Sequence, residues 1–174
     1  DSGIISGASY NIEWLYANKG SDGKISLREA IIAANNTTGV DTISFNIAGA
    51  GVHTINVLSV LPSFTEAIII DGYTQSGSSV NTSSSGSNAV LQIELNGAGA
   101  GVVSGLTLAT GSSGSTIQGL AINRFGNYGI LINNSNNNTI AGNFIGTTAA
   151  GSSALANGSG VYLLNGGNNT IGGT

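Results

Sequence analysis

A short phrase recurs in the C-terminal half of the chain, and its spacing restricts the fold more than any other feature. Each copy joins a Gly-apolar-x-apolar run to a Thr-Ile run. The offset from the glycine to the isoleucine is 11 residues in two copies, Gly129 to Ile140 and Gly160 to Ile171. An earlier copy begins at Gly105 with an offset of 12, and successive copies start 24 and 31 residues apart. Repeats of this length, made of short strands with no helix between them, predict a parallel β-solenoid in which each repeat forms one coil.

Equivalent positions of successive coils stack about 4.8 Å apart along such a solenoid. The repeats therefore predict three inward columns of apolar side chains: Leu106/Ile130/Val161, Leu108/Ile132/Leu163 and Ile117/Ile140/Ile171. Matching asparagines are expected at corners, because Asn tolerates left-handed backbone and its amide can form a ladder with the next coil: Asn134/Asn165 and Asn138/Asn169. A β-sandwich is the alternative fold, but it gives no reason for the fixed offset of 11 residues.

The N-terminal part of the chain has a different pattern. Ser26 and Glu29 have the Ser-x-x-Glu spacing of a capping box, and an apolar stripe follows, so we expect a helix over about 26–36. An entry strand containing Ile12, Trp14 and Tyr16 is predicted before it. Residues 1–40 are expected to cap one end of the solenoid. Residues 41–174 would form about four coils, and 1–174 would be a single domain.

Runs that alternate apolar and polar residues predict further strands between the cap and the repeats. Turns rich in Gly, Ser and Asn separate these runs: Thr42–Ile47, His53–Leu58, Ala67–Asp71, Val90–Leu95 and Gly105–Leu108. The last repeat stops one strand short of the earlier ones, and no charged residue follows Arg124. We therefore expect the chain to be a fragment of a longer solenoid, with Leu163 and Ile171 partly uncovered at its C-terminal edge.

The composition excludes several classes of function. Gly, Ser, Thr and Asn make up half of the chain, and only 7% of the residues are charged. Four Lys and Arg residues against eight Asp and Glu are too few for a nucleic-acid surface. No apolar run approaches the roughly 18 residues that a membrane span needs. The absence of Cys excludes disulfides and thiolate zinc sites, and the sequence predicts no cofactor and no metal site.

Four segments resemble phrases of bacterial secreted and cell-surface right-handed parallel β-helix proteins: 22–35 (DGKISLREAIIAAN), 70–75 (IDGYTQ), 123–126 (NRFG) and 142–147 (GNFIGT). The first is similar to the "CSLREA" N-terminal segment of those proteins, with Ile25 where that family often has Cys. The resemblance extends from about Tyr10 to the end of the chain. It implies an all-β, right-handed parallel β-helix with an N-terminal cap. It also implies an exported protein, secreted or at the cell surface, that acts as an adhesin or matrix component.

A carbohydrate-active enzyme, either a polysaccharide lyase or a glycoside hydrolase, is the alternative, because right-handed β-helices often carry those activities. A hydrolase of this kind needs two carboxyl groups about 5–10 Å apart, and the predicted solenoid offers Glu66, Asp71 and Glu94. A lyase would need clustered Asp residues and a base, but Arg124 is the sole basic residue after Arg28. The sequence therefore favours a role without catalysis and assigns no catalytic residue.

Two further candidates have structural explanations. Glu29 closes the capping box, and Arg28 is expected to bind a nearby acid or strand-end carbonyls. His53 is the only imidazole, and no Cys, Asp or second His lies close by in sequence to complete a metal site.

Two outward patterns bear on ligands. Thr116, Thr139 and Thr170 stack in one column, as in ice-binding solenoids, but the neighbouring column is not a second Thr row: Gln118, Ala141 and Gly172. Three tyrosines could stack on sugar rings, although such isolated rings more often pack over coil edges: Tyr73, Tyr128 and Tyr162. The sequence predicts a structural or adhesive segment that presents a rigid surface. Its expected partners are surface glycans, or other copies of the chain that stack end to end.

Overall fold

The computed structural model describes residues 10–19 and 23–173, which form two helices, a 3-10 turn and twelve strands. The helices are α1 (Ile12–Ala17) and α2 (Leu27–Asn35), and the 3-10 turn is η1 (Gly72–Thr74). The strands lie in three sheets with parallel pairing throughout. Sheet A contains β1 (Asp41–Ser44), β3 (Ile68–Asp71), β6 (Thr116–Gln118), β9 (Thr139–Ala141) and β12 (Thr170–Ile171). Sheet B contains β2 (His53–Asn56), β4 (Ile93–Asn96), β7 (Leu120–Asn123) and β10 (Phe144–Ile145), and sheet C contains β5 (Leu106–Leu108), β8 (Tyr128–Asn133) and β11 (Ser159–Leu164).

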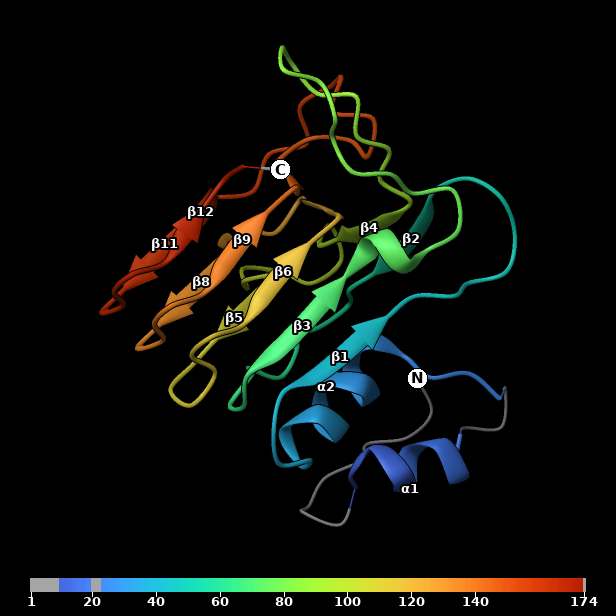
Figure 1. Cartoon of the computed structure of the whole chain (residues 1–174), viewed down its shortest axis with the longest axis vertical. Coiled ribbons are helices and arrows are strands. Elements are labelled where there is room, and N and C mark those ends of the chain that lie inside the picture. Colours follow the sequence, from blue (N-terminus) through green and yellow to red (C-terminus); the bar gives the residue numbers. More distant parts are fainter. Residues whose placement is uncertain (1–9, 20–22, 174) are drawn as a thin grey trace.

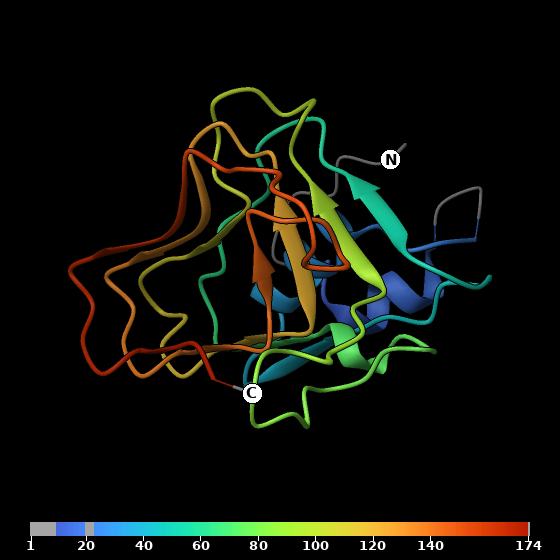
Figure 2. The same ribbon diagram turned by 90° about the horizontal axis from the view of Figure 1, so that it is seen from above.

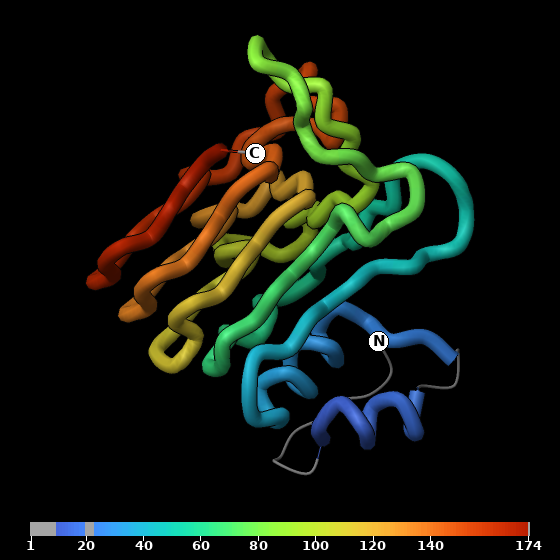
Figure 3. Tube along the Cα trace, in the orientation of Figure 1, coloured from blue at the N-terminus to red at the C-terminus, as the bar shows by residue number. Residues whose placement is uncertain are grey.

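The chain passes through sheets A, B and C in turn, and so winds into the predicted right-handed β-solenoid (Figures 1 and 2). Figure 3 shows the successive turns as rungs that follow one another from the N-terminal end to the C-terminal end. Sheet A has five strands, so the solenoid has about five turns rather than the four expected. The additional turn is the first one, where Phe64 forms a single parallel bridge to Leu108 in place of a sheet C strand.

The predicted inward columns are confirmed. Leu106, Ile130 and Val161 pair in register, as do Leu108, Ile132 and Leu163. The third column is also in register: Ile117, Ile140 and Ile171. Side chains in the middle turns are almost fully buried, whereas Leu163 is 40% exposed and Ile171 46% exposed in the last turn. The partial exposure expected at that edge is therefore present.

A polar ladder runs inside the corner between sheets C and A. Asn134 and Asn165 have the expected left-handed backbone, with φ of 54° and 55°. Asn138 is 1% exposed, and its amide donates to Ser135 Oγ at 2.9 Å and to Asn169 Oδ1 at 2.8 Å. Asn138 Oδ1 accepts from the backbone N–H of Ser115 at 2.9 Å. The ladder thus satisfies buried polar groups that would otherwise destabilise the corner.

Replacing Asn138 with Ala should lower the free energy of unfolding by about 2–4 kcal/mol, because it leaves several buried polar groups without partners. Urea denaturation followed by far-ultraviolet circular dichroism measures this change. Asn133→Ala is the matched control, since Asn133 is bonded at the surface to Asn134 Nδ2, and it should cost less than about 0.5 kcal/mol. Equal losses in the two variants would contradict the ladder.

Helix α2 covers the N-terminal end of the solenoid and lies next to β1 (Figure 1). The predicted capping box is present, with Glu29 Oε2 accepting from Ser26 N at 2.9 Å. Leu27 and Ile31 join the main core beneath the first turn. Arg28 donates to the carbonyl of Val60 at 2.8 Å and to that of Ser59 at 3.1 Å, which confirms its structural role.

The entry strand predicted around residues 12–16 is wrong, because this segment is helix α1. Asn11 caps the helix by accepting from the backbone N–H of Trp14 at 2.9 Å. Ile12 and Leu15 lie on one helical face and pack with Ala33 of α2. The period-two spacing of Ile12, Trp14 and Tyr16 therefore concealed a helical stripe, and two helices form the cap rather than one.

Candidate functional site

The outer side of sheet B carries a surface of mixed polar and aromatic character. Ile93, Leu95 and Ile122 lie in the core, so the residues that alternate with them project outward. We define the sheet B face as these outward side chains: Thr54, Asn56, Glu94, Asn96, Asn123 and Phe144. The register aligns them in two columns, one with Thr54, Glu94 and Phe144 and the other with the three asparagines. The first column spans three strand spacings, or about 14 Å along the solenoid axis.

Hydrogen bonds between coils fix the polar side chains of this face. Glu94 Oε2 accepts from Thr54 Oγ1 at 2.7 Å, and Glu94 Oε1 accepts from Asn123 Nδ2 at 2.7 Å. Asn96 Nδ2 donates to Asn56 Oδ1 at 3.0 Å. The Glu94 carboxylate is therefore held between neighbours from the turn before and the turn after it. A fixed array of hydroxyl, amide and carboxylate groups loses little conformational entropy when it binds a ligand.

The insertion after β10 folds over one end of this face as a hairpin, residues 147–154. Thr147 and Ala154 form an antiparallel bridge, and Thr148 N donates to Ser153 O at 2.9 Å. Asn123 is fully buried, and its Nδ2 also donates to Thr147 O at 2.9 Å. The hairpin is thus bonded to the sheet B face and forms a wall at its C-terminal end.

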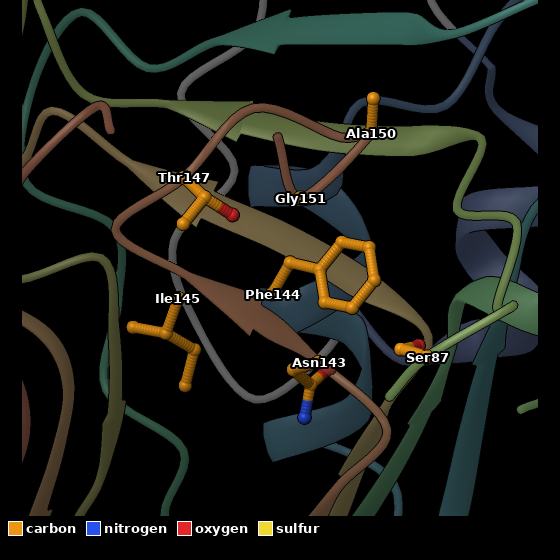
Figure 4. Close-up of a pocket in the computed structure, with 7 residues that line it drawn as sticks. All are labelled: Ser87, Asn143, Phe144, Ile145, Thr147, Ala150 and Gly151. Carbon is orange, nitrogen blue, oxygen red and sulfur yellow. The ribbon is translucent and has the colours of Figure 1, made fainter. Parts of the chain in front are cut away.

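A pocket of about 360 Å³ lies between this hairpin and the long loop before β4 (Figure 4). Its lining combines one aromatic ring with polar and small residues: Ser87, Asn143, Phe144, Ile145, Thr147, Ala150 and Gly151. The ring of Phe144 lies among these residues, with Gly151 above it and Asn143 below it in Figure 4. A Cβ atom added to Gly151 would be 3.0 Å from Cε2 of Phe144, so the ring packs closely against the hairpin. The pocket offers a half-buried aromatic surface beside hydrogen-bonding groups.

The three carboxylates named from the sequence lie in different environments. Asp71 Oδ1 accepts from the backbone N–H of Tyr73 at 2.9 Å and so caps η1. Glu94 is the one acidic side chain in the described strands of sheet B. Glu66 instead lies near Asp41, where burial first and the negative charge of Glu66 second raise the pKa of Asp41. The only electrostatically paired carboxylates seen among the described residues thus include Asp41, which the sequence did not select.

Replacing Asp41 with Asn should raise the melting temperature at about pH 7 and change it little at about pH 3. The ordinary pKa of this carboxyl is 3.8, and the folded chain raises it. The folded state therefore binds the proton more tightly than the unfolded state, and stability falls as pH rises through this interval. Asn keeps the shape and removes the charge. Thermal melts at both pH values measure the effect.

Asp71→Asn is the control with the opposite sign, because the Asp71 carboxylate accepts a backbone hydrogen bond and should stabilise η1. A lower melting temperature at neutral pH is expected for this variant. If Asp41→Asn lowered the melting temperature at neutral pH as well, the assigned repulsion between Asp41 and Glu66 would be wrong.

The basic and imidazole candidates do not complete a catalytic arrangement. Arg124 is exposed and has a left-handed backbone with φ of 60°, and its backbone N–H donates to Leu155 O at 3.3 Å. His53 has a buried Nε2 without a hydrogen-bond partner. Residues 10–19 and 23–173 contain no group of three or more His, Cys, Asp or Glu side chains that could hold a metal ion.

The tyrosines have two different roles. Tyr73 packs over coil edges as expected, and its Oη donates to Gly142 O at 2.8 Å. Burial first and the charge of Asp71 second raise the pKa of the Tyr73 phenol. Tyr128 and Tyr162 stack on each other, with ring centroids 4.5 Å apart. The sequence did not predict this pair, because the two tyrosines occupy different positions in their repeats.

The threonine column exists but stands alone. Thr116, Thr139 and Thr170 pair in register on the outer side of sheet A. The adjacent outward column contains side chains of different kinds, including Asp71, Gln118 and Ala141. This face therefore lacks the repeated threonine pairs that made ice binding a candidate.

Within the described part of the chain, no helix has the length and apolar character needed to cross a membrane. No protein-family model, no curated protein and no solved structure matches the chain.

Proposed function

We propose that this chain is a structural and adhesive β-solenoid segment of an exported bacterial protein, and that it contacts neutral glycans through the sheet B face. One observation carries the glycan assignment: the Phe144 ring forms part of a pocket at one end of a column that also presents Thr54 and Glu94. Apolar sugar faces pack on aromatic rings, and sugar hydroxyls bond to amide and carboxylate groups. A secreted or cell-surface location is part of this proposal.

The charge distribution supports neutral glycans rather than acidic ones. The chain has a net charge of −4, which disfavours association with polyanions. Glu94 is the one charged side chain of the described sheet B strands apart from His53, and both of its oxygens already accept hydrogen bonds. The amide of Asn56 and the hydroxyl of Thr54 lie on exposed residues at the N-terminal end of the face.

The regular stack supports a structural role. Five turns share continuous columns of buried side chains, and the corner ladder joins neighbouring turns through amides such as Asn138. Such a structure holds the sheet B face in one shape, which favours binding of an extended polymer. A carbohydrate-active enzyme is the alternative function. It would have to use Glu94 without a second carboxylate on the described strands of sheet B.

The test is binding of Phe144→Leu to neutral polysaccharides, measured by affinity electrophoresis. Leu retains apolar contact with Gly151 but removes the aromatic face. We expect about fivefold weaker binding, which corresponds to a stacking contribution near 1 kcal/mol.

Val102→Ala is the control, because Val102 is 84% exposed and lies outside the sheet B face. It should bind like the parent chain. Unchanged binding by Phe144→Leu, or equal loss in both variants, would refute the assignment of the site.

A further inference from the structure

Tyr128 and Tyr162 form an aromatic stack that joins two adjacent turns on sheet C. Their ring planes differ by 8° and their centroids are 4.5 Å apart. The strands that carry them, β8 and β11, pair in parallel, with Tyr128 opposite Ser159 and Tyr162 opposite Leu131. The two side chains therefore converge from offset positions of neighbouring strands.

Both phenols are chemically accessible. Tyr162 is 42% exposed, and Tyr128 is half-buried. Neither hydroxyl forms a hydrogen bond to another residue in 10–19 or 23–173, in contrast to Tyr73, whose Oη is bonded to Gly142 O. An oxidant at the surface can thus reach this pair without opening the core.

We propose that Tyr128 and Tyr162 are a site of oxidative cross-linking, in which a one-electron oxidant such as a peroxidase with hydrogen peroxide joins them as dityrosine. Each phenol gives one electron to the oxidant and its hydroxyl proton to water, which leaves two phenoxyl radicals. Their unpaired spin extends to the ring carbons beside the hydroxyl, the Cε atoms, and one Cε of each ring forms the new carbon–carbon bond. The hydrogen on each joined carbon then moves to the phenol oxygen. In total the pair loses two electrons and two protons, and the peroxide is reduced to water.

Proximity makes this pair the favoured product among the five tyrosines of the chain. Two radicals held in contact react as one unit, whereas separated radicals must meet by diffusion. Tyr10 packs edge-on against Trp14, and Tyr16 lies beside Lys19, so neither has a tyrosine partner among its printed ring contacts. The cross-link would tie β8 to β11 and enclose the segment that contains the 147–154 hairpin.

The experiment oxidises the full chain at low concentration with photoexcited ruthenium tris-bipyridine and persulfate, and then digests it with trypsin. The last cleavage site is Arg124, so one fragment, residues 125–174, contains Tyr128, Tyr162 and no other tyrosine. We expect this fragment to lose the mass of two hydrogen atoms and to show the blue fluorescence of dityrosine. The oxidised monomer should melt about 10 °C higher, because the cross-link restricts the unfolded chain.

Two variants test the assignment. Tyr162→Phe keeps a stacked ring but cannot form a phenoxyl radical, and it should reduce the fluorescence of the monomer about tenfold. Tyr16→Phe removes a 66% exposed tyrosine and should leave the fluorescence of the monomer unchanged. A fragment of unchanged mass, dityrosine found only in dimers, or equal fluorescence in Tyr162→Phe would each overturn the proposal.

Discussion

Replacing Ile132 with Asn should lower the free energy of unfolding by about 3–5 kcal/mol, because it places an amide without partners inside the solenoid. Ile132 is fully buried and lies in register between Leu108 and Leu163. Neighbouring turns cover it on both sides, so the amide cannot reach water. The midpoint of urea denaturation measures the loss.

Gln118→Ser is the control for this prediction. Gln118 lies beside the buried Ile117 in β6, but its own side chain projects outward and is only half-buried. The substitution should shift the midpoint by an amount equivalent to about 0.5 kcal/mol or less. Equal midpoints for Ile132→Asn and Gln118→Ser would contradict the assignment of the inward column.

Replacing Ile31 with Asp should detach the cap and cause aggregation. Ile31 is fully buried in α2 and belongs to the main core beneath the first turn. A buried carboxylate without a partner costs several kcal/mol, so α2 should separate from β1. The strand edge and apolar end of the first turn would then be open to other chains. Deletion of residues 1–40 should have the same result.

Size-exclusion chromatography with light scattering measures this effect. Thr38→Asp introduces the same charge at an exposed position just after α2 and should remain monomeric. A soluble, cooperatively folded monomer from Ile31→Asp or from the deletion would show that the cap does not protect this edge.

The accuracy of the sequence-based fold varies along the chain for a physical reason. From Gly105 onward the coils have nearly equal spacing, so the partners of Ile130 and Ile140 could be assigned residue by residue. The first turns contain loops of unequal length, and their register could not be derived, which is why one turn was missed. Helix α1 was missed because Ile12, Trp14 and Tyr16 fit a strand period as well as a helical one.

The candidate site was less predictable than the fold. Glu94 could be selected as a carboxylate, but its partner Thr54 lies 40 residues earlier and Asn123 lies 29 residues later. Those separations differ because the connecting loops differ, so sequence spacing does not reveal that the three side chains meet. The pocket at Phe144 depends on where the inserted hairpin folds, and its Gly- and Ser-rich sequence has no periodic pattern. A repeat predicts which strands stack, but it does not predict where its insertions pack.

The most direct measurement incubates the chain with a panel of neutral and acidic polysaccharides and records both binding and new unsaturated or reducing ends. The proposed function predicts retention by at least one neutral polysaccharide, weaker retention of Phe144→Leu, and no new chain ends. Release of unsaturated or reducing ends that disappears in Glu94→Gln would contradict it and establish a carbohydrate-active enzyme. Absence of binding to every polysaccharide in the panel would contradict the role of the sheet B face.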